Sequence, residues 1–123
     1  KVQNVLPPGS HGSTFGGNPV CCAGALSILH RLDGPLLQAV EEKSDFIVDT
    51  LTGAPGVKGV TGLGLMLGVE TVRPVADVIC ECAEQGVLVI SAKNKVRLLP
   101  ALNIPMAQLE QAIGVLKAVC AKA

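Results

Sequence analysis

The spacing of apolar residues changes along the chain between a helical period and a strand-like one. Residues 18–32 are apolar on most faces of a predicted helix, which Asn18 would cap and Pro19 would open. A helix that is apolar all round needs cover on most sides, so we expect it to pack on a further domain or on a partner subunit. A second helix is predicted to run from Asp33, its candidate N-cap, to Thr52. Apolar residues recur along it at helical spacing, and charged residues mark the face that meets solvent.

The second half of the chain alternates between strands and helices. Residues 57–61 and 65–70 alternate apolar side chains with Gly and Thr, which predicts two strands joined by a tight turn. The remaining predicted elements are a helix over 74–85, strands over 87–90 and 96–99, and a last helix from Pro105. This order predicts an α/β fold of two layers, in which helices pack on a small, mostly antiparallel sheet.

Composition narrows the possible partners. The 123 residues carry 10 basic and 10 acidic side chains without a basic cluster, and the only aromatic residues are two Phe. Such a chain does not suit nucleic acid or an anionic membrane surface as a partner. No apolar run approaches the ~20 residues of a membrane-spanning helix and no signal peptide is present, so we expect a cytoplasmic protein. The first residue is Lys rather than Met, which suggests a piece of a longer protein.

Five cysteines are an odd number, which fits poorly with a disulfide framework. Cys80 and Cys82 would project from well-separated faces of one helix, and neither His11 nor His30 has a partner at metal-ligand spacing. We therefore expect no metal site, and we interpret the cysteines as small core residues of a reduced, cytosolic protein.

The first candidate site is the stretch His-Gly-Ser-Thr-Phe-Gly-Gly-Asn-Pro at residues 11–19. Ser13 and Thr14 lie in a glycine-rich loop that opens onto a predicted helix, where hydroxyls and free N–H groups can hold an anion. The alternative is a capped turn with no ligand. The loop carries neither the P-loop pattern nor the dinucleotide-binding glycine spacing.

The second candidate is Arg97, which lies inside the apolar strand Val-Arg-Leu-Leu. A charge is costly there unless it is paired, and a guanidinium can hold a carboxylate or a phosphate through two hydrogen bonds. The alternatives are an arginine on an edge strand that faces water, or a structural ion pair with Glu70. We interpret Glu70 itself as the solvated end of a strand.

Three blocks of the chain resemble the class-III aminotransferases, which use pyridoxal phosphate. They are residues 11–19, residues 62–70 (Gly-Leu-Gly-Leu-Met-Leu-Gly-Val-Glu), and residues 86–89 with 96–104 (Val-Arg-Leu-Leu-Pro-Ala-Leu-Asn-Ile). The blocks follow in the order of the family and cover nearly the whole chain. The end of the third block is most similar to the branch whose amino donor is N-acetylornithine. The ornithine, succinylornithine and 4-aminobutyrate branches are near neighbours.

This resemblance implies a fold, a cofactor and roles for three residues. Residues 18–123 would form the C-terminal small domain of a fold-type I enzyme, preceded at 1–17 by a phosphate-contacting loop from the end of the large domain. Thr14, with Ser13 beside it, would donate to the phosphate of pyridoxal 5'-phosphate held by the other subunit of a homodimer. Arg97 would bind the carboxylate of the amino-acid or 2-oxo-acid substrate.

The implied reaction transfers an amino group from N-acetylornithine to 2-oxoglutarate in arginine biosynthesis. The family's catalytic lysine, and the aspartate that pairs with the cofactor ring, would lie upstream of this chain. Lys1 is too close to residue 11 to be that lysine, so we expect no catalytic residue here and no activity from the chain alone. Thr61 stands where the family carries an arginine. A non-enzymatic module that binds small molecules is the alternative function.

Overall fold

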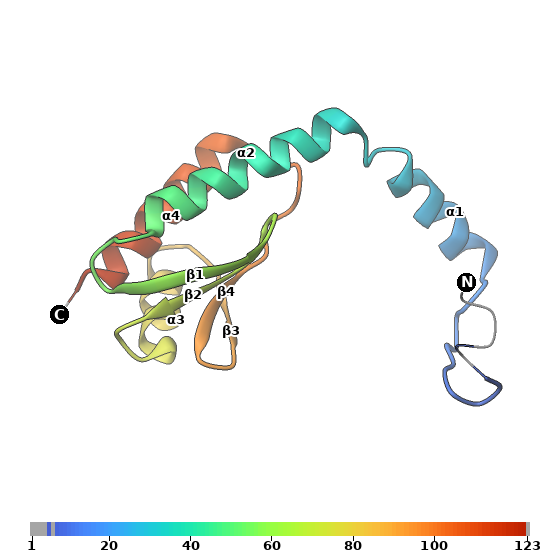
Figure 1. The fold of residues 1–123 in the computed structure, drawn as a ribbon, viewed down its shortest axis with the longest axis horizontal. Helices are drawn as coiled ribbons and strands as arrows, with labels where there is room; N and C mark the ends of the chain where they lie inside the picture. The colour runs from blue at the N-terminus through green and yellow to red at the C-terminus, as the bar shows by residue number, and fades with distance from the viewer. Residues whose placement is uncertain (1–4, 6, 123) are drawn as a thin grey trace. The chain divides into compact units, whose positions relative to one another are not determined.

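The computed structural model describes residue 5 and residues 7–122, and the chain divides into two compact units, Lys1–Asp33 and Gly34–Ala123. The first unit contains α1 (Pro19–Leu29). The second contains α2 (Gly34–Leu51), β1 (Val57–Leu63), β2 (Met66–Thr71), α3 (Val75–Glu84), β3 (Ile90–Ala92), β4 (Lys95–Leu98) and α4 (Met106–Cys120) (Figure 1). The predicted order of helices and strands is confirmed. The predicted domain boundary between residues 17 and 18 stays a prediction.

Helix α1 begins as its sequence predicts. The Oδ1 atom of Asn18 accepts hydrogen bonds from the amides of Val20 (3.0 Å) and Cys21 (3.2 Å), and Pro19 occupies the first turn. The helix ends at Leu29, three residues before its predicted end. Within the described part of the chain, no residue of α1 is buried, although the helix is apolar on every side. The cover expected for α1, from another domain or a partner subunit, stays a prediction.

The second unit is built on a four-stranded antiparallel sheet with the strand order β1-β2-β4-β3 (Figure 1). Strands β2 and β4 are therefore the inner strands. Gly68 of β2 and Ile90 of β3 lie on either side of Arg97 of β4. The alternation of side chains along each strand then decides which residues reach which face.

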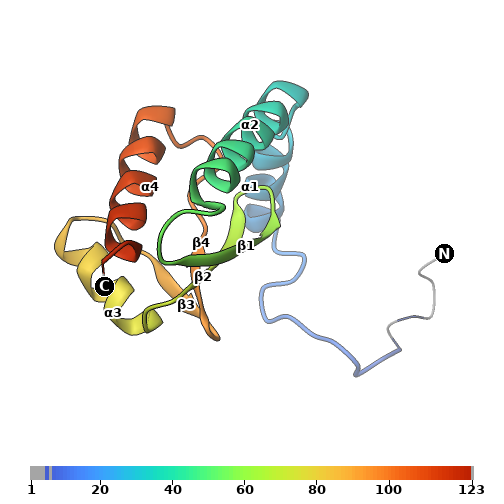
Figure 2. The ribbon, with the colours of Figure 1, turned by 60° about the vertical axis from the view of Figure 1, so that its left-hand side comes forward.

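One face of the sheet is the core of the second unit. Helices α2, α3 and α4 cover this face (Figure 2), and we call the opposite one the outer face. The sheet residues buried beneath the helices are Leu67, Val69, Val96 and Leu98, and the helices contribute Ile47, Leu51, Val78, Cys82, Leu109, Ile113, Leu116 and Val119. The predicted two-layer α/β architecture is confirmed.

Two expectations need correction. Strand β3 begins at Ile90, where its predicted range ended. The amide of Val87 bonds the Cys82 carbonyl at the end of α3 (2.9 Å), so Val87 belongs to the end of that helix and not to the strand. The interpretation of the cysteines as core residues is wrong for three of the five. Cys82 and Cys120 are buried, whereas Cys21, Cys22 and Cys80 are exposed. Cys80 and Cys82 lie on different faces of α3, as predicted.

The described residues contain neither a metal-binding cluster nor a single membrane-spanning helix. No group of three or more His, Cys, Asp or Glu side chains there could hold a metal ion. No single helix there is long and apolar enough to cross a bilayer, although α1 and α2 taken together reach the necessary length and composition.

An ionic cluster closes the second unit at the end of α4. Arg73, which follows β2, donates to the carbonyl of Val119 in α4 (2.9 Å) and pairs with the carboxylate of Glu81 in α3. The ammonium of Lys122 binds the other oxygen of Glu81 at 2.7 Å. The hydrogen bond from Arg73, together with that from Lys122, lowers the pKa of Glu81 from 4.5 to about 2. The cluster thus joins β2, α3 and the end of α4 through one carboxylate.

The Glu81 cluster predicts a pH dependence of stability. A carboxyl group whose pKa is lowered by folding stabilises the folded state above its unfolded pKa, and that contribution is lost as the pH falls from about 4.5 to about 2. Glu81→Gln should therefore lower the melting temperature at pH 7, and the difference from the wild type should shrink steadily below pH 4.5. Thermal unfolding followed by circular dichroism measures both effects. Glu84→Gln, an exposed change at the end of the same helix, is the control, and an equal loss in both variants would contradict the prediction.

Candidate functional site

The loop before α1 presents two hydroxyl groups. Ser13 and Thr14 are exposed, and the backbone turns back after them, with the amide of Gly16 bonding the carbonyl of Ser13 at 3.3 Å. A Cβ atom on Gly16 would stand 3.2 Å from the Cβ of Ser13, and Gly17 has a φ of +75°. The glycines therefore permit a tight turn that leaves both hydroxyls at the surface. Neither hydroxyl has a hydrogen-bond partner among the described residues.

The helix that follows cannot offer its first amides freely to an anion. The side chain of Asn18 already accepts from the amides of Val20 and Cys21. A capped turn and an anion loop are therefore not exclusive alternatives here, because the cap uses the helix amides while the hydroxyls stay open. Any anion at this loop would be met by Ser13, Thr14 and the loop amides rather than by those two amides of α1.

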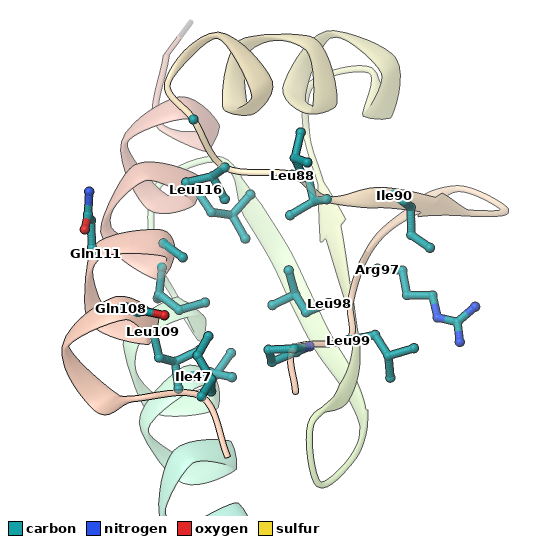
Figure 3. A pocket seen from close by; sticks show the side chains of 17 residues that line it. Ile47, Leu88, Ile90, Arg97, Leu98, Leu99, Gln108, Leu109, Gln111 and Leu116 are labelled. Atoms are coloured by element: carbon teal, nitrogen blue, oxygen red, sulfur yellow. The ribbon is translucent and has the colours of Figure 1, made fainter. Parts of the chain in front are cut away.

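Arg97 lies on the inner strand β4, between β2 and β3. Its neighbours in sequence, Val96 and Leu98, point into the core, so Arg97 projects from the outer face. Figure 3 shows its guanidinium pointing away from the helices. The alternative of an edge-strand arginine is wrong. Strand β4 is not an edge strand, because β3 pairs with the side of β4 that β2 leaves open.

The surroundings of Arg97 are mostly neutral. Its Nη2 atom approaches the Sδ atom of Met66 at 4.0 Å, and Gly68 and Ile90 flank it on the adjoining strands. Over residues 5 and 7–122, no carboxylate lies within ion-pairing distance of this guanidinium. The alternative of a structural pair with Glu70 is therefore not found, and Arg97 is left able to bind an external anion.

A second cation on the same face was missed at the sequence level. Lys95 precedes Arg97 by two positions and so emerges from the same side of β4. Its ammonium donates to the hydroxyl of Thr61 on β1 at 2.9 Å, and the Thr61 hydroxyl donates in turn to the carbonyl of Gly68 at 3.5 Å. The two-residue period of the strand was the available signal, since it places residues 95 and 97 together.

The hairpin between β1 and β2 fixes the position of Met66 beside Arg97. Gly62 has a φ of +143°, and a Cβ atom there would stand 2.1 Å from the carbonyl oxygen of Met66. Only glycine allows the two strands to approach in this way. Gly62 therefore has a structural role in this block, which is to permit the close approach of β1 and β2 at their hairpin.

An apolar cavity of about 570 Å³ lies on the helical side of the sheet. Its walls include Ile47, Leu98, Ile104, Leu109, Ile113 and Leu116, and Gln108 and Gln111 also line it. Arg97 contributes to this wall, but its guanidinium lies beyond the strands on the opposite side (Figure 3). The cavity and the cationic outer face are thus separate features of the second unit.

The candidate residues fall into two groups. Ser13 and Thr14 belong to the first unit, and Arg97 with Lys95 belongs to the second, so each group is described within its own unit. The first group offers uncharged donors for an anion, and the second offers two positive charges. Each group is chemically able to bind an anion.

Comparison with known proteins identifies the class. The family model "Aminotransferase class-III" matches residues 1–120. The chain therefore belongs to the class-III aminotransferases, and the resemblance of its three blocks to that family is confirmed.

Individual relatives refine the comparison. The acetylornithine aminotransferase of Haemophilus ducreyi is 47% identical over 94% of this chain and 30% of its own length. An ornithine aminotransferase of Toxoplasma gondii has a TM-score of 0.79 at 32% identity, covering 97% of this chain and 31% of that one. A second structure of that enzyme has partial occupancy of PLP at its active site. Its TM-score is 0.73 at 32% identity, and the match covers 98% of this chain and 31% of that one. This chain thus spans about a third of the length of these relatives.

The turn at Gly62 gives a test of how the site is built. Gly62→Ala should cost roughly 2–3 kcal/mol of unfolding free energy, because the new Cβ atom meets backbone and the φ is unfavourable for alanine. Gly59→Ala in the same strand meets no atom within 4 Å and should change stability little. Urea denaturation of both variants measures the difference. Equal stabilities would show that the close approach of β1 and β2 does not depend on Gly62.

Proposed function

We propose that this chain is the C-terminal region of an enzyme that transfers an amino group from N-acetylornithine to 2-oxoglutarate in arginine biosynthesis. The observation that carries the proposal is Arg97, which projects from an inner strand without a carboxylate partner in the described chain. It lies in the block of sequence whose end is most similar to the acetylornithine branch of the family. The 47% identity to the acetylornithine aminotransferase of Haemophilus ducreyi supports the choice of donor.

The cofactor of the proposed enzyme is pyridoxal 5'-phosphate. The loop fits a phosphate group, because the hydroxyls of Ser13 and Thr14 are exposed, lack partners among the described residues and stand on a glycine-rich turn. When bound, the cofactor supplies a ring that carries the amino group and withdraws electrons from the substrate. Thr14 and Ser13 would donate to its phosphate across the interface of a homodimer, and the parent enzyme would be cytoplasmic. The cofactor and homodimer assignments rest on the family resemblance.

Arg97 would orient the substrate. Its planar guanidinium can donate two parallel hydrogen bonds to one carboxylate, which fixes both the position and the rotation of the substrate's end. The inner strand holds the backbone of this residue on both sides, so the guanidinium starts from a rigid base. The amino-acid substrate and 2-oxoglutarate both carry a carboxylate of the kind that Arg97 would bind.

A second candidate donor is ornithine. The resemblance in fold to the ornithine aminotransferase of Toxoplasma gondii favours it, at a TM-score of 0.79. The two donors share the carboxylate and differ by an acetyl group on the α-nitrogen, so a contact to the carboxylate oxygens alone does not distinguish them. Rates of the full-length protein with N-acetylornithine, ornithine, succinylornithine and 4-aminobutyrate decide between the branches, and a preference for a donor other than N-acetylornithine would overturn the proposed one.

The role of Arg97 is tested in the full-length enzyme. Arg97→Gln should lower kcat/KM for both the amino donor and 2-oxoglutarate by roughly 100-fold, because a charged hydrogen bond to carboxylate contributes about 3 kcal/mol. Most of the change should appear in KM. Lys117→Gln, on an exposed position of α4, is the control and should leave both constants unchanged. An unchanged KM for both substrates in Arg97→Gln would refute the assignment.

The 123-residue chain by itself should be inactive. The family's catalytic lysine has no counterpart in it, so pyridoxal phosphate added to the purified chain should give neither transamination nor the absorbance band of a lysine-bound cofactor. Coupled assays for glutamate formation and absorbance spectra measure the two outcomes. Turnover by the chain alone would contradict the proposal that the catalytic lysine lies upstream.

A further inference from the structure

One end of the sheet carries a polar cavity that the proposed function does not use. This cavity of about 330 Å³ lies within the second unit, between the start of β1, the end of β2, the first turn of α3 and the turn from β3 to β4. We call it the sheet-end cavity. Three cations and one carboxylate line it, namely Lys58, Arg73, Lys93 and Glu70. Arg97 is not among its lining residues, so the sheet-end cavity is separate from the proposed substrate contact.

Two of these positive charges have no counter-charge among the described residues. Arg73 is already paired in the ionic cluster at the end of α4, and the register of β2 with β4 sets Lys95 opposite Glu70. The side chains of Lys58 and Lys93 form neither an ion pair nor a hydrogen bond within the described chain. The charge left over at the cavity is therefore positive, which favours an anionic ligand.

Lys58 reaches the cavity through an irregularity of β1. Val57 pairs with Thr71 and Gly59 pairs with Glu70, so Lys58 is an extra residue that has no partner on β2. Such a bulge takes a side chain out of the regular alternation of the strand and gives it a new direction. The other strand pairings of the described sheet contain no such shift. The one bulge of this sheet thus places a lysine at the wall of the cavity.

Lys93 reaches the same cavity from the turn between β3 and β4. Its φ is +55°, and among the described residues other than glycine no other φ is positive. The left-handed region is unfavourable for a lysine, whereas glycine adopts it readily. An unfavourable backbone at a cavity wall marks a residue whose side chain is needed there. Both unpaired lysines are therefore brought to one cavity by local departures from regular structure.

The first turn of α3 adds donors without charge. Its N-cap residue, Pro74, makes no side-chain hydrogen bond to the helix amides. The amides of Val75 and Ala76 have no acceptor in the described part of the chain, and Val75 lines the cavity. Asp77 is the acidic residue of this turn, and it does not line the cavity. Free amides at the start of a helix support a negative group that the lysines attract.

We propose that the sheet-end cavity binds the phosphate group of a small molecule, with Lys58 and Lys93 as its cations. The two lysines stand on either side of the end of β2, about two strand spacings or roughly 10 Å apart, and both line the cavity between them. A lysine ammonium is a compact charge that suits a tetrahedral phosphate, whereas the forked guanidinium suits a planar carboxylate. This site goes beyond amino transfer and does not depend on it.

Amide chemical shifts of the isotope-labelled 123-residue chain test the inference. Sodium phosphate, ethyl phosphate and acetate are titrated at neutral pH and constant ionic strength. We expect both phosphates to shift the amide signals of Lys58, Val75 and Lys93 to saturation, and acetate to bind about fivefold more weakly because it carries less charge. Tighter binding of ethyl phosphate would identify an ester as the ligand, and tighter binding of sodium phosphate the free ion. Equal binding of acetate, or no saturable shift at these amides, would overturn the inference.

Variants assign the binding to the two lysines. Lys58→Met and Lys93→Gly should each weaken phosphate binding by about fivefold, the size expected of an exposed ion pair, and Glu70→Gln should strengthen it. Lys93→Gly should also raise the melting temperature, because glycine tolerates a φ of +55°, so its weaker binding would not come from unfolding. Lys117→Met removes the same charge from an exposed position of α4 and should leave phosphate binding unchanged. An equal loss in Lys117→Met, or full affinity in Lys58→Met or Lys93→Gly, would overturn the assignment.

Discussion

The burial of one face of a four-stranded sheet is the constraint on which the rest of the second unit depends. Leu67, Val69, Val96 and Leu98 must lie beneath the helices, because they supply the sheet's half of the core. Side chains alternate along a strand, so the residues between these buried ones must face outward. Arg97 is held out of the core by its own neighbours, and the chemistry of the outer face follows from the packing of the inner one.

Much of this arrangement could be predicted from the sequence, where a local pattern determines the outcome. The cap at Asn18, the period of α4 and the alternation in β2 each depend on nearby residues and were found. The start of β3 was missed, because residues 87–90 are uniformly apolar, and the bond from the amide of Val87 to the carbonyl of Cys82 at the end of α3 leaves no mark on that pattern. Lys95 was passed over for a different reason. Its partner Thr61 is 34 residues away, and the glycine that lets it pass lies on a third strand.

The candidate residues illustrate two physical ways of meeting an anion. The loop at Ser13 and Thr14 offers uncharged donors from a chain that glycines bend back on itself, and the cap at Asn18 has taken the amides of the following helix. Arg97 and Lys95 instead offer full charges on a sheet, where the backbone is fixed by pairing on both sides. Both kinds of donor can bind an anion, and the charged pair adds stronger, charge-assisted hydrogen bonds from a backbone that strand pairing holds in place.

The placement of these cations also bears on how the chain finds its fold. A slip of β4 by one residue against β2 would exchange the two faces of the strand. Val96 and Leu98 would turn to solvent, and Lys95 and Arg97 would enter the core without partners, at a cost that is large beside the stability of a small domain. The same two charges that make the outer face attractive to an anion therefore penalise every misaligned pairing of this strand. Selection for ligand binding and selection for correct strand alignment would act on them together.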